Sequence, residues 1–146
     1  MGQNVSPRTL ANLVCVDSSV AFKWFCSDDE AFVDEAVGLF ADHAAGRLTL
    51  VAPAHLPAEV LNALASRPRM KAERLATAAE GLAESEIVFP AWDSSLLADA
   101  ARMARAHRLT IYDALFPALA VQLECELVTA DRAQARVRDC AVRLLW

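Results

Sequence analysis

The sequence is poor in the features that mark unusual classes of protein. Its four glycines form no G-x-G-x-x-G motif, so a nucleotide-dependent oxidoreductase is unsupported. No apolar run approaches the roughly 18 residues of a membrane-spanning helix. No basic segment precedes an apolar stretch at the start, so we expect no secretory signal. With 55% hydrophobic and 23% charged residues, the composition excludes a disordered or low-complexity chain.

The positions of the lysine and cysteine residues argue against several further classes of protein. No lysine follows Lys71, which argues against a phospho-acceptor signalling domain. Residues 1–6 match a myristoylation pattern, but no polybasic second signal follows, so we expect no membrane anchor. The cysteines fit no C-x-x-C or zinc pattern, and we expect a reduced, cytoplasmic protein. They are Cys15, Cys26, Cys125 and Cys140.

The order of apolar and polar segments predicts the fold. The length of 146 residues favours one domain, which we assign to residues 11–146 after a loose tail over residues 1–10. Helices alternate with short β-prone runs, and this alternation predicts an α/β fold with a mostly parallel sheet of four to five strands, covered on both faces. The expected strands are residues 12–16, 48–52, 86–89, 126–129 and 141–145. The expected helices include residues 18–25, 30–45, 70–81, 93–107 and 110–123.

Four acidic residues fall where elements meet. Asp17 ends the first expected strand, and Asp131 follows the fourth by two residues. Asp113 lies in the first turn of a helix, and Glu59 is early in another. Ligands of parallel sheets bind just beyond the carboxyl ends of the strands. The pattern therefore points to chemistry at one edge of the sheet.

Each acid also has a purely structural interpretation. Asp17 and Asp131 are suitable helix N-caps, and residues 110–113 resemble a capping box with Asp in place of Glu. Glu59 fits the favourable end of a helix dipole. Asp17 is the hardest to explain by structure alone, because it closes a strand that we expect to be buried, and a buried carboxylate needs compensation.

Taken together, the four acids favour a hard divalent cation. Neighbouring carboxylates raise one another's pKa, and Mg²⁺ or Mn²⁺ removes that cost by binding oxygen. Such an ion activates water and neutralises charge on a phosphate. Zinc is disfavoured because His43, His55 and His107 share no ligand spacing. We interpret His55, four residues before Glu59, as structural.

The charge balance is a weaker guide. A formal net charge of −5 counts mildly against a nucleic-acid binder, which usually carries a basic face. The basic residues are nevertheless clustered, and each cluster is either a solvated helix face or part of a binding surface. The clusters are Arg67, Arg69, Lys71 and Arg74; Arg102, Arg105 and Arg108; and Arg132, Arg136 and Arg138.

Four short runs resemble the motifs of PIN-domain proteins. They are VDSSVAFKWF (residues 16–25), PAEVLNAL (57–64), YDAL with ALA after it (112–120) and LVTAD (127–131). Each run is weak alone, but four in order are specific, and the resemblance extends over residues 13–145. The subgroup that the chain most resembles is the VapC-type toxins of toxin–antitoxin pairs.

The resemblance implies a small three-layer α/β/α fold and a Mg²⁺- or Mn²⁺-dependent endoribonuclease. By position, Asp17 and Asp113 would be the principal metal ligands, Asp131 would complete the site, and Glu59 would orient metal-bound water. Ser18 and Thr129 would support these side chains. The resemblance also implies a homodimer, a cognate antitoxin that lays a segment across the acidic groove, and an RNA substrate, with transfer RNA and ribosomal RNA both open.

One residue departs from the family pattern. Pro117 lies inside the third-motif helix, where it removes the hydrogen bond to the carbonyl of Asp113. Either the helix kinks and Asp113 moves, or the helix bends and the carboxylate is unaffected. The alternative to a nuclease is a PIN fold that has lost catalysis and only binds a partner, although the intact set of acids argues against it.

Overall fold

The structure, a computed structural model, describes residues 12–28 and 30–145. The expected tail and the myristoylation pattern therefore lie outside the described residues. Four strands form one all-parallel sheet in the order β2-β1-β3-β4, which confirms the α/β fold. The strands are β1 (Leu13–Val16), β2 (Thr49–Val51), β3 (Glu126–Thr129) and β4 (Val142–Leu144).

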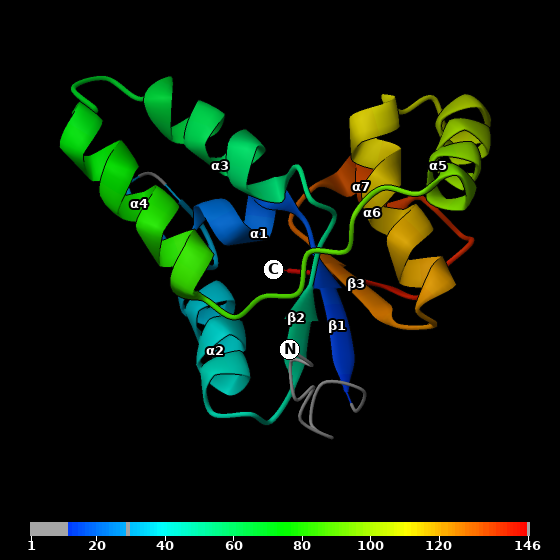
Figure 1. Ribbon diagram of the computed structural model, residues 1–146, viewed down its shortest axis with the longest axis horizontal. Helices are drawn as coiled ribbons and strands as arrows, with labels where there is room; N and C mark the ends of the chain where they lie inside the picture. The colour runs from blue at the N-terminus through cyan, green and yellow to red at the C-terminus, as the bar shows by residue number, and fades with distance from the viewer. Residues whose placement is uncertain (1–11, 29, 146) are drawn as a thin grey trace, which may run out of the picture.

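Helices lie on both sides of this sheet. Figure 1 shows α1 to α4 on one side of the strands and α5 and α6 on the other. All three residues of β2 are buried, and side chains alternate between the faces of a sheet, so both faces are covered. The helices are α1 (Ser18–Phe22), α2 (Val33–Ala44), α3 (Leu56–Ala65), α4 (Ala72–Glu84), α5 (Ser94–His107), α6 (Ile111–Gln122) and α7 (Arg132–Ala135). None of them is long and apolar enough to cross a membrane.

The strand expected over residues 86–89 is wrong. This segment makes one isolated bridge, between Val88 and Val51 of β2. Glu86 has a φ of 60°, which is incompatible with extended backbone, and Pro90 lacks the N–H that a longer ladder needs. The last expected strand is present as β4, which gives a sheet of four strands within the described residues.

The register of the sheet decides where the acids meet. Val16 of β1 is paired with Val128 of β3, so the residues that follow both strands leave the sheet at one edge. The backbone N–H of Asp17 donates to the carbonyl oxygen of Val128 at 3.3 Å, which extends the ladder by one step. Asp17 consequently lies beside Thr129 at the carboxyl ends of the two central strands.

Candidate functional site

Asp17 is the most enclosed of the four acids. It is 3% exposed and serves as the N-cap of α1, so the structural interpretation as a cap is correct. Its Oδ1 atom accepts hydrogen bonds from the Ser19 N–H at 3.1 Å, the Ser19 hydroxyl at 2.5 Å and the Val20 N–H at 3.3 Å. The Thr129 hydroxyl donates to Oδ2. One carboxylate therefore joins the end of β1 to the end of β3.

These hydrogen bonds only partly offset the cost of burying Asp17. Burial raises the pKa of Asp17 from 3.8 to about 6, against the lowering effect of the hydrogen bonds from Ser19, Thr129 and Val20. The negative charge of Asp131 raises the pKa further. A cation next to Asp17 would relieve both effects, because an opposite charge favours the ionised form.

Asp113 reaches the same edge from α6. Thr110 is the N-cap of α6, and its hydroxyl oxygen accepts from the Asp113 N–H at 3.1 Å, which is one of the two hydrogen bonds of the capping box expected from the sequence. Asp113 is half-buried, and burial is the main cause that raises its pKa. Repulsion from Glu59 and Asp131 raises that pKa further, so the three acids share one region.

The carbonyl oxygen of Asp113, which Pro117 leaves without a backbone donor, receives a hydrogen bond from another helix. Helix α6 is continuous across Pro117, which is buried with its neighbours in the core. Proline has no N–H for the carbonyl oxygen of Asp113. That oxygen instead accepts from the Gln134 side-chain amide at 2.8 Å. Gln134 is 2% exposed and belongs to α7, so the amide fastens α6 to the helix that Asp131 caps.

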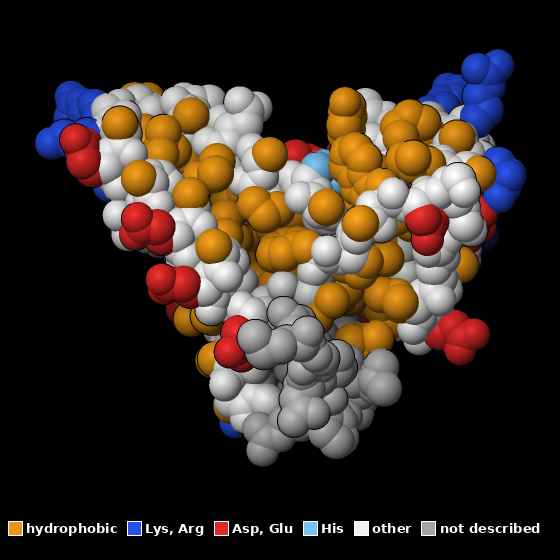
Figure 2. Space-filling view, in the orientation of Figure 1, with side chains coloured by type: hydrophobic (Ala, Val, Ile, Leu, Met, Phe, Trp, Pro, Cys, Tyr) orange, Lys and Arg blue, Asp and Glu red, His pale blue; other side chains and the backbone are white. Residues whose placement is uncertain are grey.

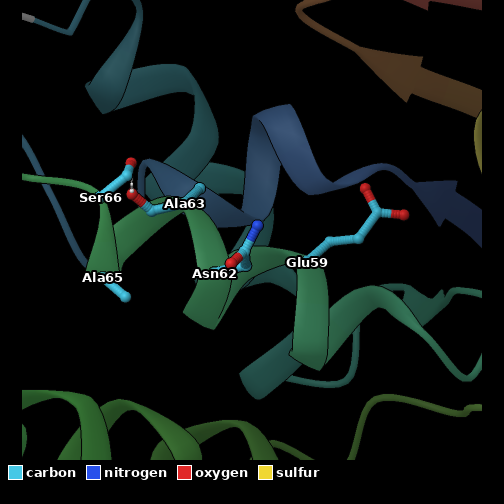
Figure 3. A pocket seen from close by; sticks show the side chains of 5 residues that line it. All are labelled: Glu59, Asn62, Ala63, Ala65 and Ser66. Carbon is cyan, nitrogen blue, oxygen red and sulfur yellow. Dashed lines mark hydrogen bonds between the residues drawn. The ribbon is translucent and has the colours of Figure 1, made fainter.

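Glu59 approaches from α3 (Figure 3), and its side chain is 33% exposed. Its Oε2 atom accepts from the Ser18 hydroxyl at 3.1 Å. The Nε2 atom of His55 lies 2.7 Å from Oε1, but its hydrogen is directed at the Tyr112 carbonyl oxygen, 2.9 Å away. Glu59 Oε1 is therefore buried without a hydrogen-bond donor. An orphaned acceptor of this kind is what a bound cation would satisfy.

Asp131 completes the set of acids. It is the N-cap of α7, as the structural interpretation predicted. Its Oδ1 atom accepts from the Ala133 N–H at 2.8 Å. Its own N–H donates to the Thr129 hydroxyl oxygen at 2.9 Å. Thr129 is thus bonded to both Asp17 and Asp131.

The structure brings all four predicted acids to one edge. Repulsion that acts on pKa values links Asp17 with Asp131, and Asp113 with both Glu59 and Asp131. Figure 2 shows acidic side chains and a histidine at the upper end of the notch between the two groups of helices. Within residues 12–28 and 30–145, however, no group of three or more Asp, Glu, His or Cys side chains is gathered closely enough to hold a metal ion.

Two residues of this network were missed by the sequence analysis. Ser19 bonds Asp17 and also accepts from the Ala130 N–H at 2.9 Å, and its position next to Ser18 was the only available signal. Gln134 carries no local signal, because its partner is far away in the sequence. His55 was interpreted as structural, and it packs against Trp92, Tyr112 and Phe116 while lying beside Glu59.

Comparison with known proteins finds one matching family model and several solved structures of similar fold. The family model of the PIN domain matches residues 14–139. No protein with a curated description matches the sequence. Among solved structures, PAE2754 from Pyrobaculum aerophilum is 22% identical, with a TM-score of 0.64 over 92% of this chain and 91% of that one.

Two further structures bear names from toxin–antitoxin systems. DNA-bound VapBC from Salmonella typhimurium is 12% identical, with a TM-score of 0.66 over 92% of this chain and 99% of that one. VapC20 from Mycobacterium tuberculosis, described as a sarcin-ricin loop cleaving toxin, is 17% identical, with a TM-score of 0.65 over 88% and 98%. At these identities the likeness is one of fold.

Proposed function

The chain belongs to the PIN domain family, and from its carboxylate site we propose that it is a metal-dependent endoribonuclease, the toxin of a type II toxin–antitoxin pair. One observation carries the proposal. Asp17 and Asp113 come from different elements, lie at one edge of the sheet and both have raised pKa values. Acids with perturbed pKa values at a strand edge are typical of a functional site rather than of surface charge.

The residues fit a divalent cation. All the side chains involved offer oxygen, which Mg²⁺ and Mn²⁺ prefer, and Glu59 Oε1 is buried without a donor. We assign Asp17 and Asp113 as the ligands of Mg²⁺ or Mn²⁺. The ion would supply a water of lowered pKa and would neutralise charge on the phosphodiester.

The neighbouring residues have supporting roles in this proposal. Glu59 orients the attacking water, and Ser18 holds Glu59 through the 3.1 Å hydrogen bond to Oε2. Thr129 fixes Asp17, and Asp131 completes the acidic edge. Catalysis in this arrangement relies on positioned charge, which suits phosphodiester hydrolysis because the transition state spreads negative charge over oxygen atoms.

The proposal includes partners. The VapBC structure from Salmonella typhimurium and FitAcB from Neisseria gonorrhoeae share the fold, and by that likeness we propose a cognate antitoxin for this chain. A basic side chain of the antitoxin placed among the four acids would neutralise them and block a metal. We further propose a homodimer, a transfer or ribosomal RNA substrate and a cytoplasmic location.

A second candidate is a PIN fold that binds a partner without catalysis. It is favoured by one observation: no three acids in the described part of the chain are gathered around a common point. In that case the acidic edge would serve only as the docking point for basic residues of a partner. The two candidates differ in whether RNA is cut.

The test is cleavage of a mixed cellular RNA pool by antitoxin-free protein with Mn²⁺ or Mg²⁺. EDTA and Asp113→Asn should both abolish the discrete fragments, because a lost metal ligand costs more than the roughly 10- to 100-fold of an outer-shell change. Asp42→Asn, at an acid paired with Arg47 away from the site, is the matched control and should cut normally. No cleavage with either metal would favour the binding module.

A further inference from the structure

A pocket of about 490 Å³ adjoins the acidic edge and has the opposite charge at its far end. Glu59, Ser18 and Ser19 line the end next to the site, and Lys23, Glu30 and Arg67 line the other. Ala63 and Ser66 of the α3 region form part of its wall. The pocket is therefore a groove that leaves the carboxylates and runs along α3 toward a basic cluster.

The cluster of Lys23, Glu30 and Arg67 carries one more positive than negative charge. Lys23 is 6% exposed, and its Nζ atom lies 2.7 Å from Glu30 Oε2. Arg67 Nη2 lies 3.0 Å from Glu30 Oε1. A single carboxylate would be enough to satisfy buried Lys23. Arg67 is the second cation at Glu30 and is not needed to neutralise that carboxylate. Its positive charge is therefore available to a ligand.

The guanidinium of Arg67 is held in a fixed position by two contacts. Its guanidinium lies 4.9 Å from the centre of the Phe22 ring, and Glu30 holds one of its amino groups. A guanidinium has five N–H donors, so donors remain after the contact with Glu30. The side chain is 31% exposed. Because two contacts already fix the guanidinium, little side-chain entropy is lost when it binds a ligand.

The wall between the two ends is lined by small side chains. Figure 3 shows Ala63 of α3 and Ser66 at its C-terminal end, both beyond Glu59, and both are exposed. The helical rise of about 1.5 Å per residue separates Glu59 from Ser66 by roughly 10 Å along the helix axis. A phosphate beside Arg67 is therefore not the phosphate held at the carboxylates, but one farther along the same strand.

We propose that Arg67, supported by Phe22, Glu30 and Lys23, binds a backbone phosphate of the RNA next to the one that is cleaved. This inference rests on the proposed nuclease function and extends it to the path of the substrate. The acidic edge repels a polyanion, and a fixed cation at the end of the groove offsets that repulsion. An arginine is suited to the task because its planar fork matches phosphate oxygens.

The test measures binding of a 20-nucleotide mixed-sequence single-stranded RNA by fluorescence anisotropy in EDTA, at several salt concentrations. Arg67→Gln should weaken binding and reduce the slope of log K against log salt by about 0.7, the change expected for one phosphate contact. Glu30→Gln should act in the opposite direction and tighten binding, because it removes the internal competitor for both cations. Arg105→Gln on α5, with the same change in charge, should leave the slope unchanged.

The outcomes test the phosphate site separately from the nuclease activity. An unchanged slope in Arg67→Gln, or no measurable binding of RNA by the unmodified chain, overturns the phosphate site. A purely structural ion pair would lower the melting temperature of both Arg67→Gln and Glu30→Gln without altering the slope. Arg67-dependent binding of poly-glutamate in preference to RNA would assign the groove to an acidic peptide. Cleavage with Mn²⁺, measured in parallel, reports on the nuclease independently.

Discussion

The two sides of the acidic edge are built differently. On the sheet side, Asp17 is 3% exposed and accepts from three residues, of which Thr129 comes from the neighbouring strand. On the helix side, Glu59 has a side chain 33% exposed and accepts from Ser18 alone. One carboxylate is enclosed by the fold, and the other is partly exposed to solvent while lying 2.7 Å from His55 Nε2.

This difference explains why four acids meet without forming a ready metal site. The hydrogen bonds hold Asp17 in place, but its charge stays poorly compensated, and its pKa is raised to about 6. The helix-side acids are less enclosed, since Glu59 is 33% exposed and Asp113 is half-buried. In the proposed metal site, Asp17 would be the anchor and the helix-side acids the adjustable part.

The largest effect should come from removing the charge of the anchor. Because the folded pKa of Asp17 lies above its unfolded value of 3.8, ionised Asp17 destabilises the fold, and stability is lost as pH rises from about 4 through about 6. Asp17→Asn should therefore stabilise the metal-free protein above pH 6 by up to about 3 kcal/mol, and hardly at all below pH 4.

Urea unfolding in EDTA across pH 3.5–8 measures this effect. The relevant quantity is the difference in unfolding free energy between Asp17→Asn and the unmodified chain. Asp42→Asn, at a half-exposed acid, supplies the reference profile. A difference that is independent of pH, or that grows toward low pH, would contradict the account of Asp17 as a buried and poorly compensated charge.

We expect a smaller effect on cleavage when the hydroxyl that donates to the acid on either side is removed. Thr129→Val keeps the shape of the side chain but removes the donor to Asp17, and we expect metal-dependent cleavage to fall by roughly 10- to 100-fold. Ser18→Ala should cost less, because Glu59 is partly solvated and can find water instead. Rates under single-turnover conditions give the comparison, with Thr77→Val on α4 as the control. Equal losses in Thr129→Val and Ser18→Ala would remove the distinction between anchor and adjustable part.

The smallest effect concerns the link that holds Asp113 in place. Gln134→Leu leaves the Asp113 carbonyl oxygen without a donor and should cost about 1–3 kcal/mol of stability. Pro117→Ala supplies a backbone N–H to that oxygen and should recover part of the loss in the double variant. A double-mutant cycle on unfolding free energies measures the coupling. Strictly additive changes would show that the two residues act independently.

The sequence predicts most of the secondary structure around the site because contacts between nearby residues determine it. Asp17 follows a β-prone run, Thr110 opens a capping pattern, and both are N-caps as expected. Once a parallel sheet is assumed, the ends of β1 and β3 must share an edge, and the convergence of Asp17 and Asp131 follows.

What the sequence fails to predict depends on contacts between distant segments. The bond from Gln134 to Asp113 exists only after α6 and α7 have packed, and no local pattern announces it. The strand expected around Val88 fails for a local reason, since the positive φ of Glu86 stops the extended run. Arg67 was counted in a basic cluster, but only the fold reveals its pairing with Glu30.

The hydrogen bond between Thr129 and Asp17 spans 112 positions of the chain. Proteins are synthesised from the N-terminus, so Asp17 emerges from the ribosome early and waits for β3 before its carboxylate is enclosed. Asp113 likewise waits for Gln134. A partly made chain therefore carries the acids without the contacts that place them. Under the proposed function, an active nuclease would form only after β3 and α7 have been synthesised.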